Sequence, residues 1–327
     1  MALLTELSLA SAAPLARGFN LDLRKIEPLM AGSVNSNFRL TDSAGKVYFA
    51  RLYEEQDYAG ALREHAVVAA LDDAGVPVVR ALKAKDGGSL ADFEGKAFAV
   101  FPWIEGEILC QAKVTPQACV DLGAALARVH SCSQRVPALP GGRFRIPDLR
   151  ERLQRVEASG RASLLPAVST IRERLDFYEA NRVKNLEQGI CHGDLFRDNV
   201  LWQGPKLRAL IDFESVCLNN FAYDLMVTAL AWGYGARFEI GLVQALFDGY
   251  RSVRPLPAAE VAALRSEGAI ACLRFASTRL TDFSLRVPEG TPPARDFGRF
   301  LARMTAIENG ALDTCIASLA AGAQISR

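Results

Sequence analysis

Hydrophobic and polar positions follow a strand-like pattern in the first third of the chain, and part of that third has helical spacing. Apolar-rich runs bounded by turn residues predict strands at 25–31, 37–42 and 46–53. Residues 57–75 have the apolar spacing of a helix and end in a glycine with proline soon after. The apolar run 97–104 predicts a buried strand. We therefore expect a small antiparallel sheet with one helix.

The remaining two thirds are mainly helical in pattern. One short apolar run at 207–216 predicts a strand. The predicted helices are 115–132, about 148–158, 165–184, 221–233, 238–252, 257–284 and 294–320. A chain of 327 residues exceeds one compact core. We predict an α+β fold with two lobes, an N-lobe of residues 1–104 and a C-lobe of residues 105–327, and a site in the cleft between them.

The composition of the chain argues against several classes of protein. Hydrophobic residues make up 50% and the net charge is +1, which is ordinary for a globular chain and gives no basic footprint for nucleic acid. No apolar run reaches membrane-spanning length, and the N-terminus carries Glu6 without a basic region, so we expect a cytoplasmic protein with no membrane partner. Seven cysteines without a C-x-x-C spacing indicate core residues and neither a disulfide framework nor a zinc site.

Chemistry-bearing residues gather in "ICHGDLFRDNVLW", residues 190–202. Gly, Asp and Asn also favour plain turns, so a turn is the simplest interpretation. The pattern H-x-D-x-x-x-x-N, followed by a strand and "IDF", instead matches the needs of phosphoryl transfer. Asp194 would accept the proton of the attacking hydroxyl. Asn199 and Asp212 would be oxygen ligands of Mg²⁺.

Neighbouring residues would support this loop. His192 is expected to orient it and not to transfer protons. Asp224 enters an apolar helix, where an unbonded acid is costly, and we expect it to hold the backbone of the loop. His130 is either a structural histidine or a second support beneath the loop.

A phosphate-binding segment is expected upstream, in "MAGSVNSNF" at 30–38. Its backbone N–H groups and the hydroxyls of its serines would cap phosphates, although a hairpin turn has a similar composition. The candidate residues of this segment are Gly32, Ser33, Asn35, Ser36 and Asn37. No G-x-x-x-x-G-K-[ST] occurs, which argues against a P-loop enzyme.

Four further positions are candidates for nucleotide contacts. Arg51 lies inside a predicted strand and needs a partner, for which Glu64 on the next helix is the natural candidate. An arginine binds phosphate through its planar fork. An edge-strand arginine and an exposed glutamate are the alternative. Phe101 and Trp103 would line an adenine pocket or pack in the core.

Acceptor-binding candidates lie near the C-terminus and in the loop itself. Arg279 and Asp282 occupy i, i+3 positions in "LRFASTRLTDF", which also carries Arg274. The first two are either a surface ion pair or the groups that hold the carboxylate and ammonium of an amino acid. Asp198 in the loop is the third candidate.

These motifs resemble the aminoglycoside phosphotransferase and choline kinase superfamily, a branch of the protein-kinase-like fold. "CHGDLFRDNVLW", "LRALIDFESV", "FAYDLMVTALAW" and "LGAALARVH" carry the resemblance, which covers nearly the whole chain. Within the superfamily the chain is most similar to bacterial homoserine kinases of the kinase-like type. "HGD" stands where those kinases have "HAD", and Arg51 stands where many relatives have lysine.

The resemblance implies ATP and Mg²⁺ as cofactors and phosphorylation of L-homoserine, with Gly32 to Asn37 as the phosphate loop and residues 100–104 as the adenine hinge. Two alternatives remain. A relative acting on another hydroxyl acceptor, such as an amino alcohol, a sugar or an aminoglycoside, would share the same ATP-binding residues. A nucleotide-binding pseudoenzyme would not need to retain Asp194, Asn199 and Asp212.

Overall fold

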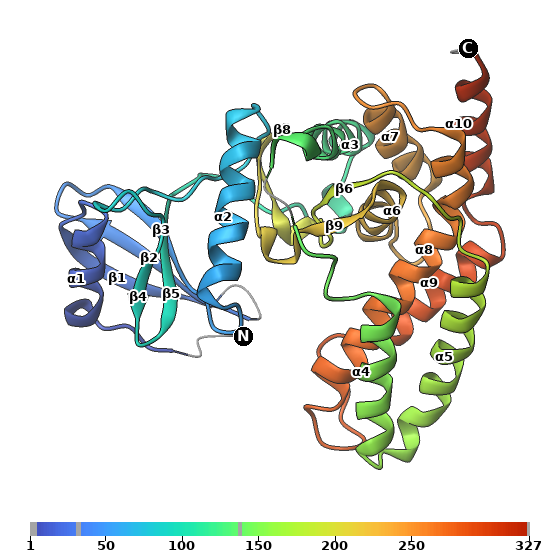
Figure 1. Ribbon diagram of the computed structural model, residues 1–327, viewed down its shortest axis with the longest axis horizontal. Helices are drawn as coiled ribbons and strands as arrows, with labels where there is room; N and C mark the ends of the chain where they lie inside the picture. Colours follow the sequence, from blue (N-terminus) through green and yellow to red (C-terminus); the bar gives the residue numbers. More distant parts are fainter. Residues whose placement is uncertain (1–4, 31–33, 137–138, 326–327) are drawn as a thin grey trace. The chain divides into compact units, whose positions relative to one another are not determined.

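The computed structural model describes residues 5–30, 34–136 and 139–325 (Figure 1). They form two compact units. The first contains the chain up to Ile108, a short piece that begins at Arg135, and Val200–Glu214. The second contains Leu109–Gln134, Leu139–Asn199 and the chain from Ser215 onward. A small antiparallel sheet and a mainly helical remainder give the predicted α+β class.

The first unit is built on a five-stranded antiparallel sheet with the order β1-β2-β3-β5-β4. Its strands are β1 (Leu23–Leu29), β2 (Ser36–Asp42), β3 (Val47–Leu52), β4 (Ala91–Phe93) and β5 (Lys96–Pro102). Burial alternates along β3 because successive side chains face opposite sides of the sheet. The four predicted strands are confirmed within two residues at each end, and β4 was not predicted.

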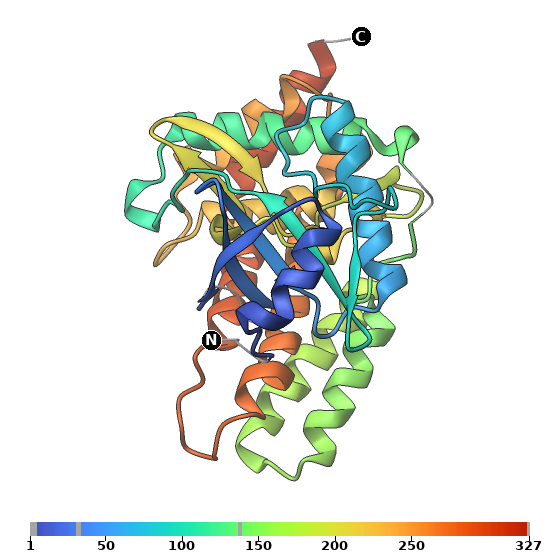
Figure 2. The ribbon, with the colours of Figure 1, turned by 90° about the vertical axis from the view of Figure 1, so that its left-hand side faces the viewer.

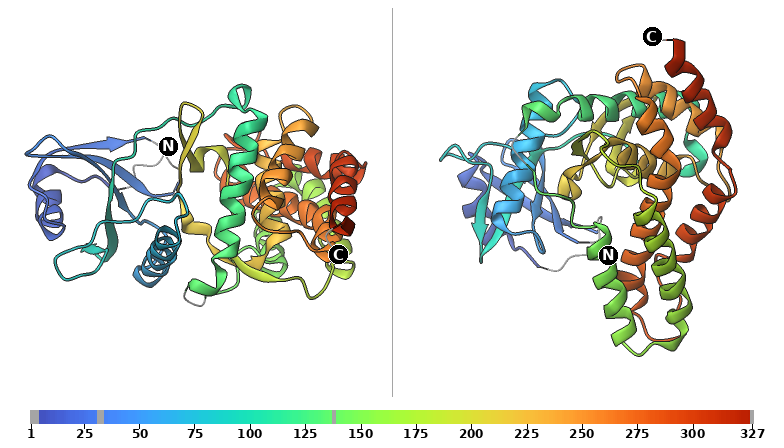
Figure 3. Two further views of the ribbon diagram at one scale, coloured as in Figure 1. Left: turned by 90° about the horizontal axis from the view of Figure 1, so that it is seen from above. Right: turned by 45° about the vertical axis from the view of Figure 1, so that its right-hand side comes forward.

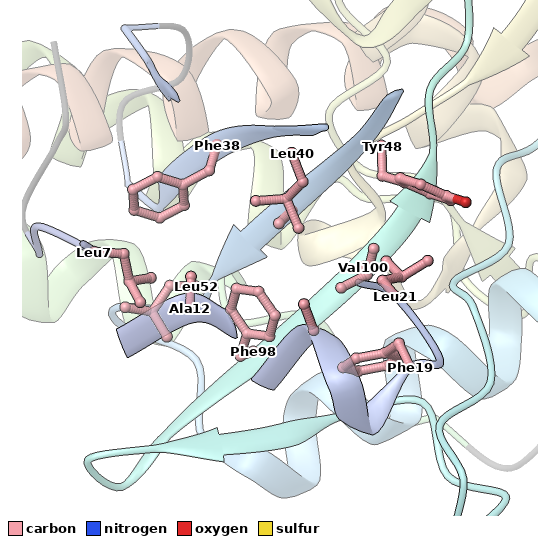
Figure 4. Close-up of a cluster of buried hydrophobic side chains, with 12 residues drawn as sticks. Leu7, Ala12, Phe19, Leu21, Phe38, Leu40, Tyr48, Leu52, Phe98 and Val100 are labelled. Carbon is pink, nitrogen blue, oxygen red and sulfur yellow. The ribbon is translucent and has the colours of Figure 1, made fainter. Parts of the chain in front are cut away.

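Two helices cover the two faces of this sheet. Helix α1 (Leu9–Gly18), which the sequence did not predict, lies across one face, where Ala12 packs against Phe38 and Phe98 (Figures 2 and 4). Helix α2 (Tyr58–Asp73) is the predicted helix and begins after the N-cap Asp57. It packs Ala61 against the other face.

A two-stranded hairpin from later in the chain belongs to the first unit. It consists of β7 (Val200–Gln203) and β8 (Lys206–Leu210). Leu210 N–H donates to the carbonyl of Pro77 at 2.7 Å, and Glu107 N–H donates to the carbonyl of Trp202 at 2.7 Å. These bonds explain why Val200–Glu214 groups with the first unit, whereas the sequence placed a single boundary after residue 104. Strand β8 is also shorter than the predicted 207–216.

The second unit is mainly helical and holds one small antiparallel pair, β6 (Gln188–Cys191) and β9 (Cys217–Asn220). Figures 1 and 3 show α4 and α5 lying beside the C-terminal half of α8. The helices are α3 (Pro116–Ser131), α4 (Ile146–Ala158), α5 (Leu165–Ala180), α6 (Phe221–Trp232), α7 (Ile240–Arg251), α8 (Ala258–Arg279), α9 (Gly298–Glu308) and α10 (Asp313–Ile325).

The predicted helices of this unit are confirmed except for the last. The single helix expected at 294–320 is wrong, because Gly310 adopts a φ of +80° and separates α9 from α10. Helix α8 ends at Arg279 and continues as a π-helical turn, Leu280–Ser284.

Helices α3 and α7 approach each other closely because glycines face the partner backbone. A Cβ atom on Gly249 would lie 2.0 Å from the carbonyl oxygen of Val120, and one on Gly123 would lie 2.1 Å from that of Leu246. Neither position tolerates a side chain. The closest approach therefore joins the first half of α3 to the last turns of α7.

Within the described ranges, none of the helices combines the length and apolar character needed to cross a membrane. The seven cysteines all lie in the described part of the chain and form no disulfide there, and all except Cys110 are buried, which confirms that most of them are core residues.

Candidate active site

The loop from His192 to Asn199 follows β6 in the second unit and ends in a 3₁₀ turn, Arg197–Asn199. Gly193 has a φ of +75°, and a Cβ atom there would lie 2.9 Å from the carbonyl oxygen of Ser215. Both facts require glycine. The side chain of Asn199 donates to the carbonyl of Asp194 at 2.7 Å, and the buried His192 accepts from the N–H of Asp194 at 3.3 Å. This bond joins the His192 ring to the backbone of the loop, and the role of His192 in orienting the loop stays a prediction.

The carboxylate of Asp224 binds the backbone at the start of this loop. Its carboxylate accepts from the backbone N–H of His192 and from that of Gly193, each at 2.7 Å. The side chain is fully buried, at 0% exposure. Because the carboxylate fixes two consecutive peptide groups, it sets the path of the backbone that leads into Asp194. This confirms the contact expected from the sequence.

His130 is the second support beneath the loop, and it acts through Asp224. Its Nε2 lies 3.0 Å from the Asp224 carboxylate, and its Nδ1 lies 2.7 Å from the hydroxyl of Tyr250. Tyr250 donates to Nδ1, so the ring proton is on Nε2 and is donated to Asp224. The structure therefore favours the supporting role for His130 over the unconnected structural histidine.

The charge state of this buried pair follows from its surroundings. Burial alone would raise the pKa of Asp224, but the hydrogen bond from His130 and the N–H of Gly193 outweigh it, and the pKa is lowered. Burial lowers the pKa of His130. The pair is therefore an ionised carboxylate with a neutral imidazole.

Cys191 lies close enough to His130 and Asp224 for the three to be considered as metal ligands. Burial raises the pKa of the Cys191 thiol, which opposes the thiolate that a metal would need. The thiol donates to the carbonyl of Asn219 at 3.4 Å. Hydrogen bonding therefore accounts for this cluster.

Asp194 projects from the loop, with its side chain 35% exposed. Its Oδ1 accepts from Nη1 of Arg274 at 3.1 Å, and the arginine side chain is 5% exposed. An acid that is partly exposed and carries one cationic neighbour can accept a proton from a bound hydroxyl. The sequence noted Arg274 but gave it no role. The available signal was a charged residue between Leu273 and Phe275 in a run that is otherwise apolar.

Asp212 lies in the first unit, just after β8. It has a φ of +66°, which is strained for a residue with a side chain. Its Oδ1 accepts from Nη1 of Arg51 on β3 at 3.0 Å. Its side chain remains one-third exposed, at 33%.

Arg51 thus binds Asp212, and Glu64 is a further charge in its surroundings. Burial would lower the pKa of Arg51, but the carboxylates of Asp212 and Glu64 outweigh it and the pKa is raised. Arg51 Nε also donates to Asn37 Oδ1 at 3.4 Å. Glu64 is buried on α2, which corrects the alternative of an exposed helical glutamate.

The predicted phosphate-binding segment is partly described. Gly32 and Ser33 lie outside the described residues. Asn35 is buried and its amide donates to Glu214 at 3.1 Å. Ser36 is fully buried and its hydroxyl donates to Glu54 at 2.5 Å. That bond gives the Ser36 hydroxyl a structural partner, so the structure does not support its expected contact with phosphate.

The adenine candidates lie at the end of β5 and are half-buried. The ring of Phe101 contacts those of Phe49 and His65, with centroids 5.9 and 5.5 Å apart. The guanidinium of Arg39 lies 5.4 Å from the ring of Trp103. Phe101 therefore packs against the sheet, while its role toward a nucleotide stays a prediction.

The acceptor candidates Arg279 and Asp282 have different partners in the structure. Asp282 accepts from Arg152 at 2.8 Å, and Arg279 donates to the carbonyl of Asp296 at 2.7 Å. The proposed surface ion pair between the two is thus corrected. Asp198 is exposed and lies 3.9 Å from Arg295.

Asn199 in the second unit and Asp212 in the first unit each offer an oxygen atom that could bind a magnesium ion. The amide nitrogen of Asn199 is bound to the Asp194 carbonyl, which leaves its amide oxygen as a ligand atom. Asp212 engages Arg51 through Oδ1, which leaves its second carboxylate oxygen. Oxygen atoms of this kind are the ligands that Mg²⁺ takes.

Comparison with known proteins gives a consistent picture. Residues 25–256 match the model of the phosphotransferase enzyme family. A homoserine kinase from Methylocella silvestris is 32% identical over 294 residues, covering 89% of this chain and 90% of that protein. One from Mesorhizobium japonicum is 33% identical over 295 residues, covering 86% and 88%.

Solved structures show the same fold. An amicoumacin kinase in complex with AMP-PNP, Ca²⁺ and Ami has a TM-score of 0.70 at 18% identity, covering 90% of this chain and 92% of that chain. A choline kinase from Cryptosporidium parvum has a TM-score of 0.65 at 15% identity, covering 91% and 92%. The chain therefore belongs to the phosphotransferase enzyme family and is a phosphotransferase that acts on a hydroxyl group.

Proposed function

We propose that this enzyme transfers the γ-phosphoryl group of ATP to the side-chain hydroxyl of L-homoserine. The observation that carries the proposal is the Asp194 loop, fixed by Asp224 and ending in Asn199, in a chain whose relatives named homoserine kinase align over almost their whole length. The amicoumacin kinase of the same fold was solved with AMP-PNP, which supports a nucleoside triphosphate as donor.

In the proposed reaction, Asp194 accepts the proton of the acceptor hydroxyl as its oxygen forms a bond to the γ-phosphorus. The bond between that phosphorus and the bridging oxygen breaks, and ADP leaves. A magnesium ion would be held by Asn199 and Asp212 and would offset phosphate charge. Arg51 would bind phosphate with the donors not used by Asp212, and the described part of the 30–38 segment would contribute backbone N–H groups.

The nucleotide and acceptor roles of the remaining candidates are part of the same proposal. Phe101 and Trp103 are assigned to adenine, Glu64 to the support of Arg51, and Asp198 to the acceptor. Arg279 and Asp282 would have to give up the contacts they make here to hold an amino acid.

The test is ADP release with Mg·ATP across L-homoserine, D-homoserine, L-serine, choline, ethanolamine and kanamycin. Strong turnover with L-homoserine alone supports the proposal. Turnover only with another member of the panel keeps the kinase and discards the biosynthetic acceptor. Mg·ATP binding without transfer to any acceptor would support a pseudoenzyme.

A further inference from the structure

Arg274 is a buried cation whose charge is directed at the proposed base. It lies on α8 within a run of buried residues, and the whole residue is 4% exposed. Removing a guanidinium from water is costly unless it gains partners. Its hydrogen bond goes to Asp194 Oδ1 at 3.1 Å.

Two phenyl rings hold the guanidinium in place. Its central carbon lies 4.2 Å from the ring centroid of Phe144 and 3.7 Å from that of Phe275. Phe275 in turn stacks on Phe300, with centroids 4.8 Å apart and an interplanar angle of 21°. Aromatic rings attract a guanidinium but accept none of its in-plane hydrogen bonds, so its N–H groups still need acceptors.

Arg274 differs from the structural arginines of the same unit. Arg182 binds the buried Glu267 through two nitrogens, Nε and Nη2, each at 2.7 Å. Arg254 binds Glu260 through both terminal nitrogens, also at 2.7 Å. These are two-bond, fork-like pairs, and Arg254 also donates to Glu187 at 2.7 Å.

Within the described part of the chain Arg274 makes one hydrogen bond, to Asp194, although a guanidinium has five N–H donors. Among the residues that the structure describes, nothing accepts from its buried Nε. The acid that it touches is the partly exposed Asp194. Arg274 therefore has unused N–H donors, and they lie beside Asp194, the acid that accepts a proton in the proposed reaction.

We propose that Arg274 binds the carboxylate of the acceptor, so that the enzyme selects hydroxyl compounds that carry a carboxylate a short carbon chain away. This inference rests on the proposed function and names the residue that sets its acceptor class. The hydroxyl of the acceptor would contact Asp194 while its carboxylate binds the neighbouring guanidinium. A planar, always charged fork is suited to a carboxylate.

This assignment competes with the one drawn from sequence spacing, which gave the carboxylate to Arg279. In the structure Arg279 donates to a backbone carbonyl, that of Asp296, and lies over the ring of Phe300 at 4.4 Å. It has no contact with Asp194 among the described residues. The two arginines lie on the same helix, so variants of each can be compared directly.

The experiment compares kcat/KM for L-homoserine with kcat/KM for 3-aminopropan-1-ol, in which a hydrogen replaces the carboxylate. The variants are R274M, R274K and R279M, with R150M as the control, because Arg150 pairs with the exposed Asp176 and Glu179. A loss of folded protein, or a change in the basicity of Asp194, lowers both values together. The ratio of the two therefore reports carboxylate recognition alone.

The wild-type enzyme is expected to prefer L-homoserine by about 100-fold or more, as for a desolvated charge pair. R274M is expected to remove most of that preference. R274K should keep part of it, since an ammonium retains the charge but not the fork. R279M and R150M should keep the wild-type ratio.

An R274M enzyme with the wild-type ratio would overturn the inference and leave the homoserine proposal standing. Loss of the ratio in R279M instead would move the carboxylate site to that residue. Equal use of both compounds by the wild-type enzyme would overturn the inference alone, because L-homoserine would still be phosphorylated. Use of neither compound would remove the inference together with the proposed acceptor.

Discussion

Replacing Asp224 by asparagine tests whether the loop that carries Asp194 depends on a buried carboxylate. The side chain accepts three hydrogen bonds, two from the backbone N–H groups of His192 and Gly193 and one from His130. An asparagine has the same shape but only one oxygen. We expect D224N to lose both stability and activity.

The magnitude follows from the arrangement of donors. Oδ2 of Asp224 accepts two bonds and Oδ1 accepts one, from Gly193 at 2.7 Å. The best placement of the amide keeps its oxygen on the two donors and turns its NH₂ group toward the N–H of Gly193. A charge-assisted bond contributes about 1.5–3 kcal/mol and a neutral one about 0.5–1.5, while a buried unpaired donor costs about 1–3. The free energy of unfolding should therefore fall by about 3–5 kcal/mol.

Urea unfolding at pH 7.5 measures this loss, and ADP release with Mg·ATP and the acceptor found to be active measures turnover. We expect kcat to fall about 100-fold, the effect of a shift of about 1 Å in a catalytic group. The control is D248N, since Asp248 lies in the same unit and its ion pair with Arg251 is 40% exposed on the acid side. It should change the unfolding free energy by less than about 1 kcal/mol. A D224N protein within 1 kcal/mol of wild type, with unchanged kcat, would refute the argument.

Three further predictions follow. D194N should show a normal thermal unfolding transition yet lose about 1,000-fold in kcat. Wild-type-like turnover would exclude Asp194 as the base. G193A should be less stable than G160A in urea unfolding, because both positions have positive φ but only at Gly193 would a Cβ meet a backbone oxygen, at 2.9 Å; equal losses would show that the contact is relieved at no cost. Burial lowers the pKa of His65 to about 4. Because an unfolded histidine has a pKa of about 6.5, the unfolded chain binds more protons than the folded chain between these two values. The free energy of unfolding should therefore fall by about 2 kcal/mol as the pH drops from 7.5 to 5. H65Q should lack this part of the pH dependence in urea unfolding, and an unchanged dependence would assign it to other groups.

The sequence predicted elements with a clear period better than features that depend on tertiary contacts. Strands β1, β2, β3 and β5 and most helices follow from apolar spacing and from caps such as Asp57. Helix α1 was missed because Pro14 lies inside it, and a proline within a helical pattern usually marks the end of a helix or a kink. The division of the last predicted helix depends on the left-handed conformation of Gly310, which a helical pattern does not show.

Within the candidate site, one contact could be predicted from the sequence and the other pairings could not. The bonds of Asp224 to the loop could be predicted, because an acid in an apolar helix next to an unusual loop has few other partners. The pairing of Arg51 with Asp212 joins β3 to a residue 161 positions later, and nothing in local spacing specifies it. Arg274 was not assigned, because the face that each residue of α8 presents is set by packing.

In this loop, buried groups hold the backbone while the partly exposed Asp194 faces the proposed acceptor. Asp224, His130 and Tyr250 form a chain of hydrogen bonds in which every polar atom named above has a partner, and such a network gives the backbone one position. Asp194 follows that backbone, its carboxylate accepts from Nη1 of Arg274, and its side chain stays partly exposed. Because the buried network already fixes the backbone of the loop, Arg274 can keep unused N–H donors beside Asp194 without disordering the loop. Those unused donors are where the carboxylate of an acceptor would bind. Substitutions in the network of Asp224, His130 and Tyr250 should therefore lower kcat for every acceptor, whereas substitutions of Arg274 should change the preference of the enzyme between acceptors.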